Sequence, residues 1–149
     1  MKKVVLIASD HAGFLTKEKL KIFLLKKGYT LVDFSPKLIS GDDYPDYAFA
    51  LGKEVASSGN LGILVCGSGA GMTIAANKVK GIRAVEAYDI FTAKLSREHN
   101  DANVLSLSGW HISFDKIKKI TEVFLETKFS GEKRHIRRIK KIEKYELRK

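Results

Sequence analysis

Short apolar runs alternate along this chain with segments in which apolar residues recur every three or four positions. The runs have the length of buried strands, and they cover residues 3–9, 29–34, 61–66, 82–86 and 103–107. The other segments have the period of amphipathic helices, which we expect over residues 15–25, 47–57, 72–78, 89–99 and 113–127. A further, basic helix is expected after Gly131, over about 132–147.

Strands that alternate with helices predict a parallel sheet with helices on both faces. We therefore expect one α/β domain over residues 1–149, with a doubly wound, Rossmann-like sheet of five strands in the order 2-1-3-4-5. In such sheets, ligands bind at the carboxyl ends of the strands, beside the point where the strand order reverses. That point lies between the first and third strands, so the residues that follow these two strands are candidates for a site.

A glycine-rich turn follows the third strand and holds the one cysteine of the chain. Its sequence is Cys66-Gly67-Ser68-Gly69-Ala70-Gly71. Before a helix, such a turn exposes backbone N–H groups at the positive helix end, where a thiolate or another anion is stabilised. The turn thus combines a candidate base or nucleophile, a hydroxyl group and an anion cradle. Tight packing around an inert, buried cysteine is the alternative explanation.

Two further polar clusters lie beside strands. Asp10 and His11 follow the first strand and suit contacts with sugar hydroxyls or a phosphate, although Asp10 as a helix cap with an exposed His11 is equally consistent. Before the fifth strand, His99 is suited to proton transfer near neutral pH, and Asn100 to donating a hydrogen bond to a developing oxyanion. A helix that ends with Asn100 in a left-handed turn would also explain this second cluster.

Composition narrows the class of protein. The 149 residues include 27 Lys and Arg against 17 Asp and Glu, a net charge of +10, which favours an anionic partner. No apolar run reaches the roughly 18 residues of a membrane span, and the run at 4–8 is too short for a signal-peptide core. A single cysteine forms no disulfide within the chain, so a reducing cytoplasm is the expected location.

Much of the positive charge lies in the last segment, EKRHIRRIKKIEKYELRK. Arg134 and Arg138 are four positions apart and share a helix face, so both guanidinium groups can reach one phosphate. Ile136, Ile139 and Ile142 form a narrow apolar stripe, which we expect to pack on a partner subunit in a homodimer. Binding of nucleic acid through this helix is the alternative from another class. The sequence has no zinc-ligand spacing, RNA-binding aromatic motif or helix-turn-helix pattern in its favour.

These clusters occur in an order that resembles the ribose-5-phosphate isomerase B family, which also contains the subunits of galactose-6-phosphate isomerase. The resemblance rests on SDHAGF at 9–14, DDYPDYA at 42–48, CGSGAGMTIAANKVKGIRA at 66–84, SREHNDANVL at 96–105 and RHIRRI at 134–139. It is collinear over nearly the whole chain. The segments in this order are far more specific than the glycine-rich turn alone.

The resemblance implies a cytoplasmic aldose–ketose isomerase of the pentose phosphate pathway, which interconverts ribose 5-phosphate and ribulose 5-phosphate without a metal or an organic cofactor. It also implies a homodimer or a dimer of dimers, with shared active sites and no membrane. The catalytic roles that it implies fall on Cys66 as the base, Ser68 as a proton shuttle, and His99 and Asp10 in ring opening. The implied substrate-binding groups are the backbone of Gly67, Gly69, Ala70 and Gly71, and the side chains of His11, Tyr44, Asn100, Arg134 and Arg138.

Two residues need a closer look: Cys66 needs a shifted pKa to act as the base, and Trp110 departs from the pattern of the family. A base at Cys66 needs a thiol pKa below the ordinary value of about 8.5, which we expect the helix N-terminus to supply. Trp110 stands where many members have an arginine that contacts phosphate. Compensation by His111 and stacking of Trp110 on the sugar are the two alternatives, and a six-carbon substrate such as allose 6-phosphate or galactose 6-phosphate stays open. A thiol-redox enzyme is a third class, but the chain has no second cysteine to resolve a mixed disulfide.

Overall fold

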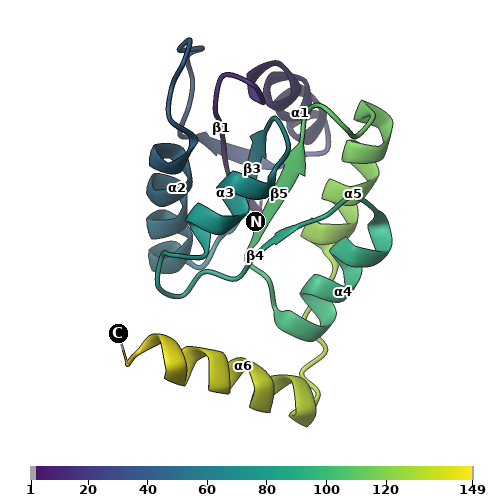
Figure 1. Ribbon diagram of the computed structural model, residues 1–149. Helices are drawn as coiled ribbons and strands as arrows, with labels where there is room; N and C mark the ends of the chain where they lie inside the picture. The colour runs from purple at the N-terminus through teal and green to yellow at the C-terminus, as the bar shows by residue number, and fades with distance from the viewer. Residues whose placement is uncertain (1–2, 149) are drawn as a thin grey trace.

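In the computed structural model, which describes residues 3–148, five parallel strands form one sheet with helices on both faces (Figure 1). The strands are β1 (Val4–Ser9), β2 (Thr30–Asp33), β3 (Leu61–Cys66), β4 (Ala84–Glu86) and β5 (Val104–Ser108). The helices are α1 (Phe14–Lys26), α2 (Tyr44–Ser58), α3 (Ala70–Ala76), α4 (Ile90–Asn100), α5 (Phe114–Glu126) and α6 (Lys133–Glu146). Each predicted strand and helix is present, with ends that differ by a few residues. No helix within the described range is long and apolar enough to cross a bilayer.

The strand order is β2-β1-β3-β5-β4, so the predicted order 2-1-3-4-5 is wrong at one edge. β5 has the sequence VLSLS, is buried at all five positions and pairs with β3. β4 has three residues, all half-buried, and pairs with β5 at the edge of the sheet. A strand that is buried on both faces belongs inside a parallel sheet, whereas a short and partly exposed one is tolerated at an edge. Burial therefore decides this order.

The strands divide their side chains between two apolar layers. On one face, alternate residues such as Ile63 pack against α1, α4 and α5, with Phe124 at the centre of the layer. On the other face, the intervening residues such as Leu64 pack against α2 and α3, where Met72 is fully buried. Cys66 is the last residue of β3 and belongs to the second layer. The two-residue period of the strand thus places the thiol beside α3.

Local sequence signals determine where several helices begin and end. Asp89 precedes α4 and Ser113 precedes α5, and each side chain accepts a hydrogen bond from the backbone N–H three residues later, as an N-cap does. Gly59 ends α2 with φ at 72°, a conformation that glycine adopts without strain. After α4 the left-handed residue is Asp101, with φ at 45°, and not Asn100, which is the last residue of the helix.

α6 lies across the amino-terminal edge of the sheet, at the end opposite to the strand arrowheads (Figure 1). It packs on the rest of the chain through apolar and polar residues, and Ile139 is buried. The His135 ring lies against the His99 ring with centroids 4.3 Å apart and an interplanar angle of 38°, and the Gly81 N–H donates to a Glu146 carboxylate oxygen at 2.9 Å. Ile142 is 55% exposed. The predicted apolar stripe is therefore only partly covered by its own chain.

Candidate active site

A cavity of about 360 Å³ opens at the carboxyl edge of the sheet, between the ends of β1 and β3. It is lined by Asp10, His11, Ala12, Tyr44, Cys66, Gly67, Ser68, Gly71 and Trp110. This is the edge at which a doubly wound sheet holds its ligand. The structure thus gathers the polar residues that follow the first and third strands around one space. Among residues 3–148, no three His, Cys, Asp or Glu side chains are placed to hold a metal ion.

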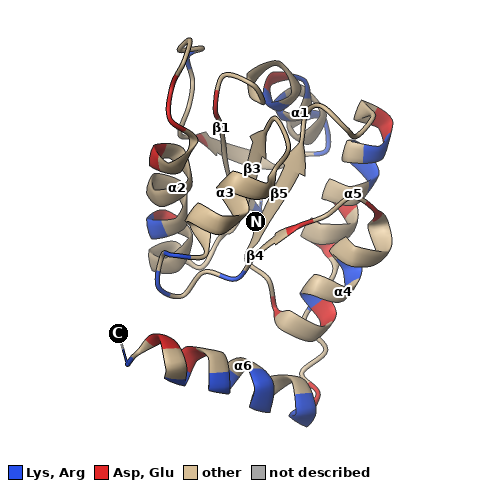
Figure 2. Ribbon diagram, viewed as in Figure 1, with Lys and Arg blue, Asp and Glu red and all other residues tan. Residues whose placement is uncertain are grey.

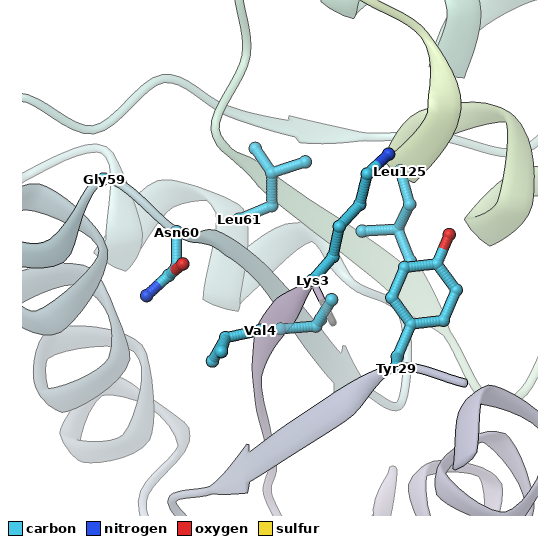
Figure 3. Close-up of a pocket in the computed structure, with 8 residues that line it drawn as sticks. Lys3, Val4, Tyr29, Gly59, Asn60, Leu61 and Leu125 are labelled. Carbon is cyan, nitrogen blue, oxygen red and sulfur yellow. The ribbon is translucent and has the colours of Figure 1, made fainter. Parts of the chain in front are cut away.

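A larger cavity, of about 530 Å³, lies at the amino-terminal edge of the sheet (Figure 3). Val4, Leu61 and Leu125 supply apolar walls, and Lys3 and Tyr29 add an ammonium group and a phenol. None of the residues that the sequence analysis assigned to a site line it. Convergent polar groups, rather than volume, mark the smaller cavity as the candidate site.

Cys66 is 5% exposed and lies at the start of the glycine-rich turn. The Gly69 N–H donates to its sulfur atom at 3.1 Å. Burial nevertheless raises the pKa of the Cys66 thiol above its ordinary value, and the negative charges of Asp10 and Glu86 add to this rise. The backbone N–H groups of Gly69 and Met72 act in the opposite direction. The predicted lowering of the pKa is therefore wrong for this chain by itself, because desolvation outweighs the helix N-terminus.

Two buried serines of β5 hold the glycine-rich turn. The Ser108 hydroxyl donates to the carbonyl oxygen of Gly67 at 2.7 Å, and the Ser106 hydroxyl donates to that of Gly69 at 2.8 Å. Gly69 has φ at 100°, where residues with a side chain are strained. These bonds fix the turn from the sheet side and help to aim the Gly69 N–H at the sulfur of Cys66. Neither serine can be recognised as part of the site from the sequence, because an apolar strand pattern does not show which groups its hydroxyls contact.

Asp10 and His11 face the cavity from the turn after β1. Asp10 accepts a hydrogen bond from the Gly13 N–H at 2.9 Å within the turn that leads into α1, and burial raises the pKa of its carboxyl group. The His11 ring shares a hydrogen bond of 2.7 Å with the Asp42 carboxylate, which raises the pKa of this histidine. The His11 side chain is 46% exposed. It therefore offers positive charge to an anion over a wider pH range than a free histidine does.

Asp42, like Ser106 and Ser108, has a role in the site that the sequence did not indicate. Besides the His11 ring, it binds the His11 backbone N–H at 2.9 Å and the Tyr47 hydroxyl group at 2.8 Å. The residue lies in the polar loop before α2, within the DDYPDYA segment. A carboxylate 31 positions from its histidine leaves no spacing signal in a single sequence. The resemblance could have pointed to it, since it shares a matching segment with Tyr44.

Two aromatic rings cover glycine backbone at the cavity. A Cβ atom on Gly71 would lie 2.6 Å from the Tyr44 ring, and one on Gly67 would lie 2.7 Å from three atoms of the Trp110 indole. Each ring thus lies directly on the turn, and a larger residue beneath it would displace it. Trp110, the residue that departs from the pattern of the family, lines the cavity and is 68% exposed.

Four residues assigned to the site lie at the other end of the molecule. α4 runs back from the end of β4 to the start of β5, so His99 and Asn100 are at the amino-terminal edge. Arg134 and Arg138 are on α6, across the same edge (Figure 1). Arg134 forms an ion pair of 2.8 Å with Glu132. A single chain therefore does not bring these four side chains to the thiol.

The fold is that of a doubly wound α/β protein, and the smaller cavity lies at the switch point of the sheet, where proteins of this class bind their ligands. The sequence profile of the family described as Ribose/Galactose Isomerase matches residues 5–142. The chain belongs to this family of isomerases.

Relatives of known name match over almost the full length. The putative sugar phosphate isomerase YwlF of Bacillus subtilis (strain 168) is 44% identical over 144 residues, which cover 95% of this chain and 96% of that protein. Ribose-5-phosphate isomerase B of Escherichia coli (strain K12) is 37% identical over 150 residues, which cover 100% and 99%. The crystal structure of ribose-5-phosphate isomerase B from Mycoplasma genitalium with bound ribulose-5-phosphate has a TM-score of 0.94 and 41% identity, and covers 100% of this chain and 99% of that one.

Proposed function

We propose that this isomerase interconverts ribose 5-phosphate and ribulose 5-phosphate with Cys66 as its base. The observation that carries the proposal is the single cavity at the switch point that is lined by Cys66, Ser68, Asp10 and His11. The names of the relatives support the substrate, since several are ribose-5-phosphate isomerases B and one was solved with ribulose-5-phosphate bound.

The chemistry is a proton transfer between two neighbouring carbon atoms. The Cys66 thiolate removes the proton from C2 of the open-chain aldose, and the electron pair of that bond forms an enediolate with its charge on O1. The Ser68 hydroxyl group carries a proton from O2 to O1, and the Cys66 thiol returns a proton to C1. The ketose forms without an external oxidant or reductant, because C2 is oxidised as C1 is reduced. A positioned base of this kind accelerates such a step by about 10²–10⁴-fold.

Backbone and side-chain donors stabilise the enediolate. The Gly69 N–H is directed at the sulfur, so it stabilises the thiolate. The Ala70 N–H donates to the Ser68 hydroxyl oxygen at 3.4 Å, so we assign the Gly71 N–H, in the first turn of α3, as the backbone donor for the developing oxyanion. Loss of one such donor costs on the order of 10²–10³-fold in rate.

We infer that two copies of the chain complete each site. The cavity has His11 as its cation, whereas Arg134, Arg138, His99 and Asn100 lie at the opposite edge of the same chain. In a homodimer with two-fold symmetry, α4 and α6 of one copy supply these groups to the cavity of the other. Arg134 and Arg138 then bind the phosphate with His11, while His99 joins Asp10 in ring opening. The added positive charge also lowers the pKa of the thiol, against the effect of burial.

A mixing experiment tests the shared site and the base together. Cys66→Ala and Arg134→Ala chains are prepared separately, each with little activity on ribose 5-phosphate, then mixed in equal amounts and allowed to exchange subunits. If sites are shared, half of the dimers are mixed and hold one intact site, so about a quarter of the wild-type activity returns. If all groups act within one chain, the mixture stays as inactive as its parts. Wild-type activity in Cys66→Ala alone rejects the cysteine base.

Two measurements test the alternatives, namely a six-carbon substrate and binding of nucleic acid through the basic helix. Isomerase activity is measured on allose 6-phosphate and galactose 6-phosphate beside ribose 5-phosphate. A higher kcat/KM on either six-carbon sugar would identify it, and not ribose 5-phosphate, as the preferred substrate. A nucleic-acid-binding protein would instead show affinity for duplex or single-stranded DNA that falls steeply with salt and is unaffected by Cys66→Ala.

A further inference from the structure

Trp110 exposes a large aromatic surface inside the cavity that holds Cys66. The residue is 68% exposed, and the proton-transfer mechanism above makes no use of it. Aromatic side chains in a concave site with a few polar groups are typical of ligand contact, whereas an indole open to water adds little to folding. The position and exposure of this ring therefore call for an account in terms of the ligand.

The backbone around Trp110 is bound to the glycine-rich turn by several hydrogen bonds. The Gly109 N–H donates to the carbonyl oxygen of Cys66 at 2.8 Å, and the Trp110 N–H donates to that of Gly67 at 3.2 Å. The Ser108 hydroxyl donates to the same Gly67 oxygen and accepts from the His111 N–H at 3.1 Å. These bonds hold the backbone of Trp110 at a defined place relative to the thiol, and the contact of the ring with Gly67 positions the indole, as a preorganised surface requires.

The faces of the two aromatic rings give the cavity a particular chemistry. The six-membered ring of Trp110 rests on Gly67, and the Tyr44 ring rests on Gly71. The face of an aromatic ring is electron-rich and attracts groups with partial positive charge, such as the C–H groups along a sugar. Sugar hydroxyl groups then meet the polar lining at Ser68 and Asp10. An uncharged indole, by contrast, offers no counter-charge to a phosphate.

We propose that Trp110 is a specificity-determining residue whose indole is a platform for the carbon chain of the sugar phosphate. The proposal deepens the isomerase function and rests on it for the identity of the substrate. Binding through Trp110 depends on the sugar carbons and not on the phosphate group. The side chain therefore sets which sugar is held beside Cys66, while the cationic residues hold the phosphate.

Fluorescence tests the contact directly, because Trp110 is the one tryptophan of the chain. The Cys66→Ala variant, which binds without turnover, is titrated with ribose 5-phosphate, and in parallel with inorganic phosphate at matched ionic strength. We expect a saturable change in tryptophan emission with the sugar phosphate and none with inorganic phosphate. No change with the sugar phosphate, or the same change with inorganic phosphate, overturns the platform.

Two substitutions at Trp110 distinguish the contribution of its aromatic face to binding from that of its apolar volume. Trp110→Phe keeps a ring, and Trp110→Leu keeps apolar volume alone. We expect Trp110→Leu to raise KM for ribose 5-phosphate roughly 3- to 10-fold, with kcat little changed, and Trp110→Phe to stay near the wild type. The inhibition constant of inorganic phosphate should not move in either variant. An unchanged KM in Trp110→Leu, or a parallel rise of KM and the phosphate constant, contradicts the proposal.

The platform and the isomerase function fail in different ways. Emission that responds to ribose 5-phosphate in a protein that turns over none of the three sugar phosphates supports the platform and rejects the isomerase function. Turnover with silent emission and an unchanged KM in Trp110→Leu overturns the platform alone. Absence of both turnover and an emission change rejects the two together.

Discussion

Gly13 is the point of closest approach between the turn after β1 and the end of β3. A Cβ atom at this position would lie 2.1 Å from the carbonyl oxygen of Val65 and 2.8 Å from the backbone nitrogen of Cys66. Cβ atoms in proteins stay at least 3.0 Å from such neighbours, so Gly13→Ala must separate the two segments by about 0.9 Å, the difference between 3.0 and 2.1 Å. The neighbours are backbone atoms of an inner strand, so the turn moves rather than the strand.

The displaced turn carries Asp10 and His11 away from the thiol. A misplacement of about 1 Å at reacting groups lowers the rate on the order of 10²-fold, and overpacking costs about 1–3 kcal/mol of stability. We therefore expect kcat/KM on ribose 5-phosphate to fall about 100-fold in Gly13→Ala, with a melting temperature only a few degrees lower.

The matched control is Gly52→Ala in α2, where the added Cβ atom would lie 3.1 Å from a methyl group of Val79. The Cβ atom of Val79 would lie 3.3 Å away, but Val79 is in the loop after α3 and can shift by a few tenths of an ångström. Alanine also favours the helix, so activity and melting temperature should stay close to the wild type. Steady-state kinetics and thermal unfolding of the two variants decide the matter. Gly13→Ala activity within threefold of the wild type would refute the close-approach reasoning, as would an equal loss in Gly52→Ala.

Three further changes test single features of the site. When the protein is diluted until it is monomeric, the rate of Cys66 alkylation by iodoacetamide should rise with pH with a midpoint above the ordinary thiol pKa of about 8.5, because burial raises the pKa of Cys66. A lower midpoint would contradict the effect of burial. Asp42→Asn should lower the pKa of His11, so that KM begins to rise at a lower pH than in the wild type; superimposable KM profiles exclude this role. Ser108→Ala removes one of two donors to the buried Gly67 carbonyl, which keeps the Trp110 N–H, and should destabilise the fold by about 0.5–1.5 kcal/mol in denaturant unfolding, while an unchanged midpoint argues against this bond.

The elements of this fold follow from apolar periodicity, but their lateral order does not. Buried strands and amphipathic helices differ in period, so each element is visible in its own segment. Whether β4 or β5 lies beside β3 depends on burial on both faces, which emerges only when the helices are in place. The buried pattern of β5 holds this information, and the two serines in its sequence obscure it.

The location of the candidate site could be predicted from the sequence, whereas most of the contacts within it could not. Asp10, His11 and Cys66 gather because the ends of neighbouring parallel strands share one edge. The bond between Ser108 and Gly67 joins residues 41 positions apart, and such a pair has no local spacing. The sequence predicts a lowered pKa at Cys66, whereas burial raises it in the chain by itself. The helix end is visible in the sequence, but the depth of burial is not.

In the proposed dimer, the basic residues along α6 (Figure 2) lie beside the cavity of the other copy, where they also affect how the substrate reaches the site. The chain has a net charge of +10, and a sugar phosphate is an anion. The field of such a surface extends over about 8 Å at physiological ionic strength and draws anions inward before any contact forms. Lysines that never touch the substrate thus speed its arrival. Added salt should slow this capture without altering proton transfer, so the effectiveness of the enzyme on scarce substrate depends on the ionic strength around it.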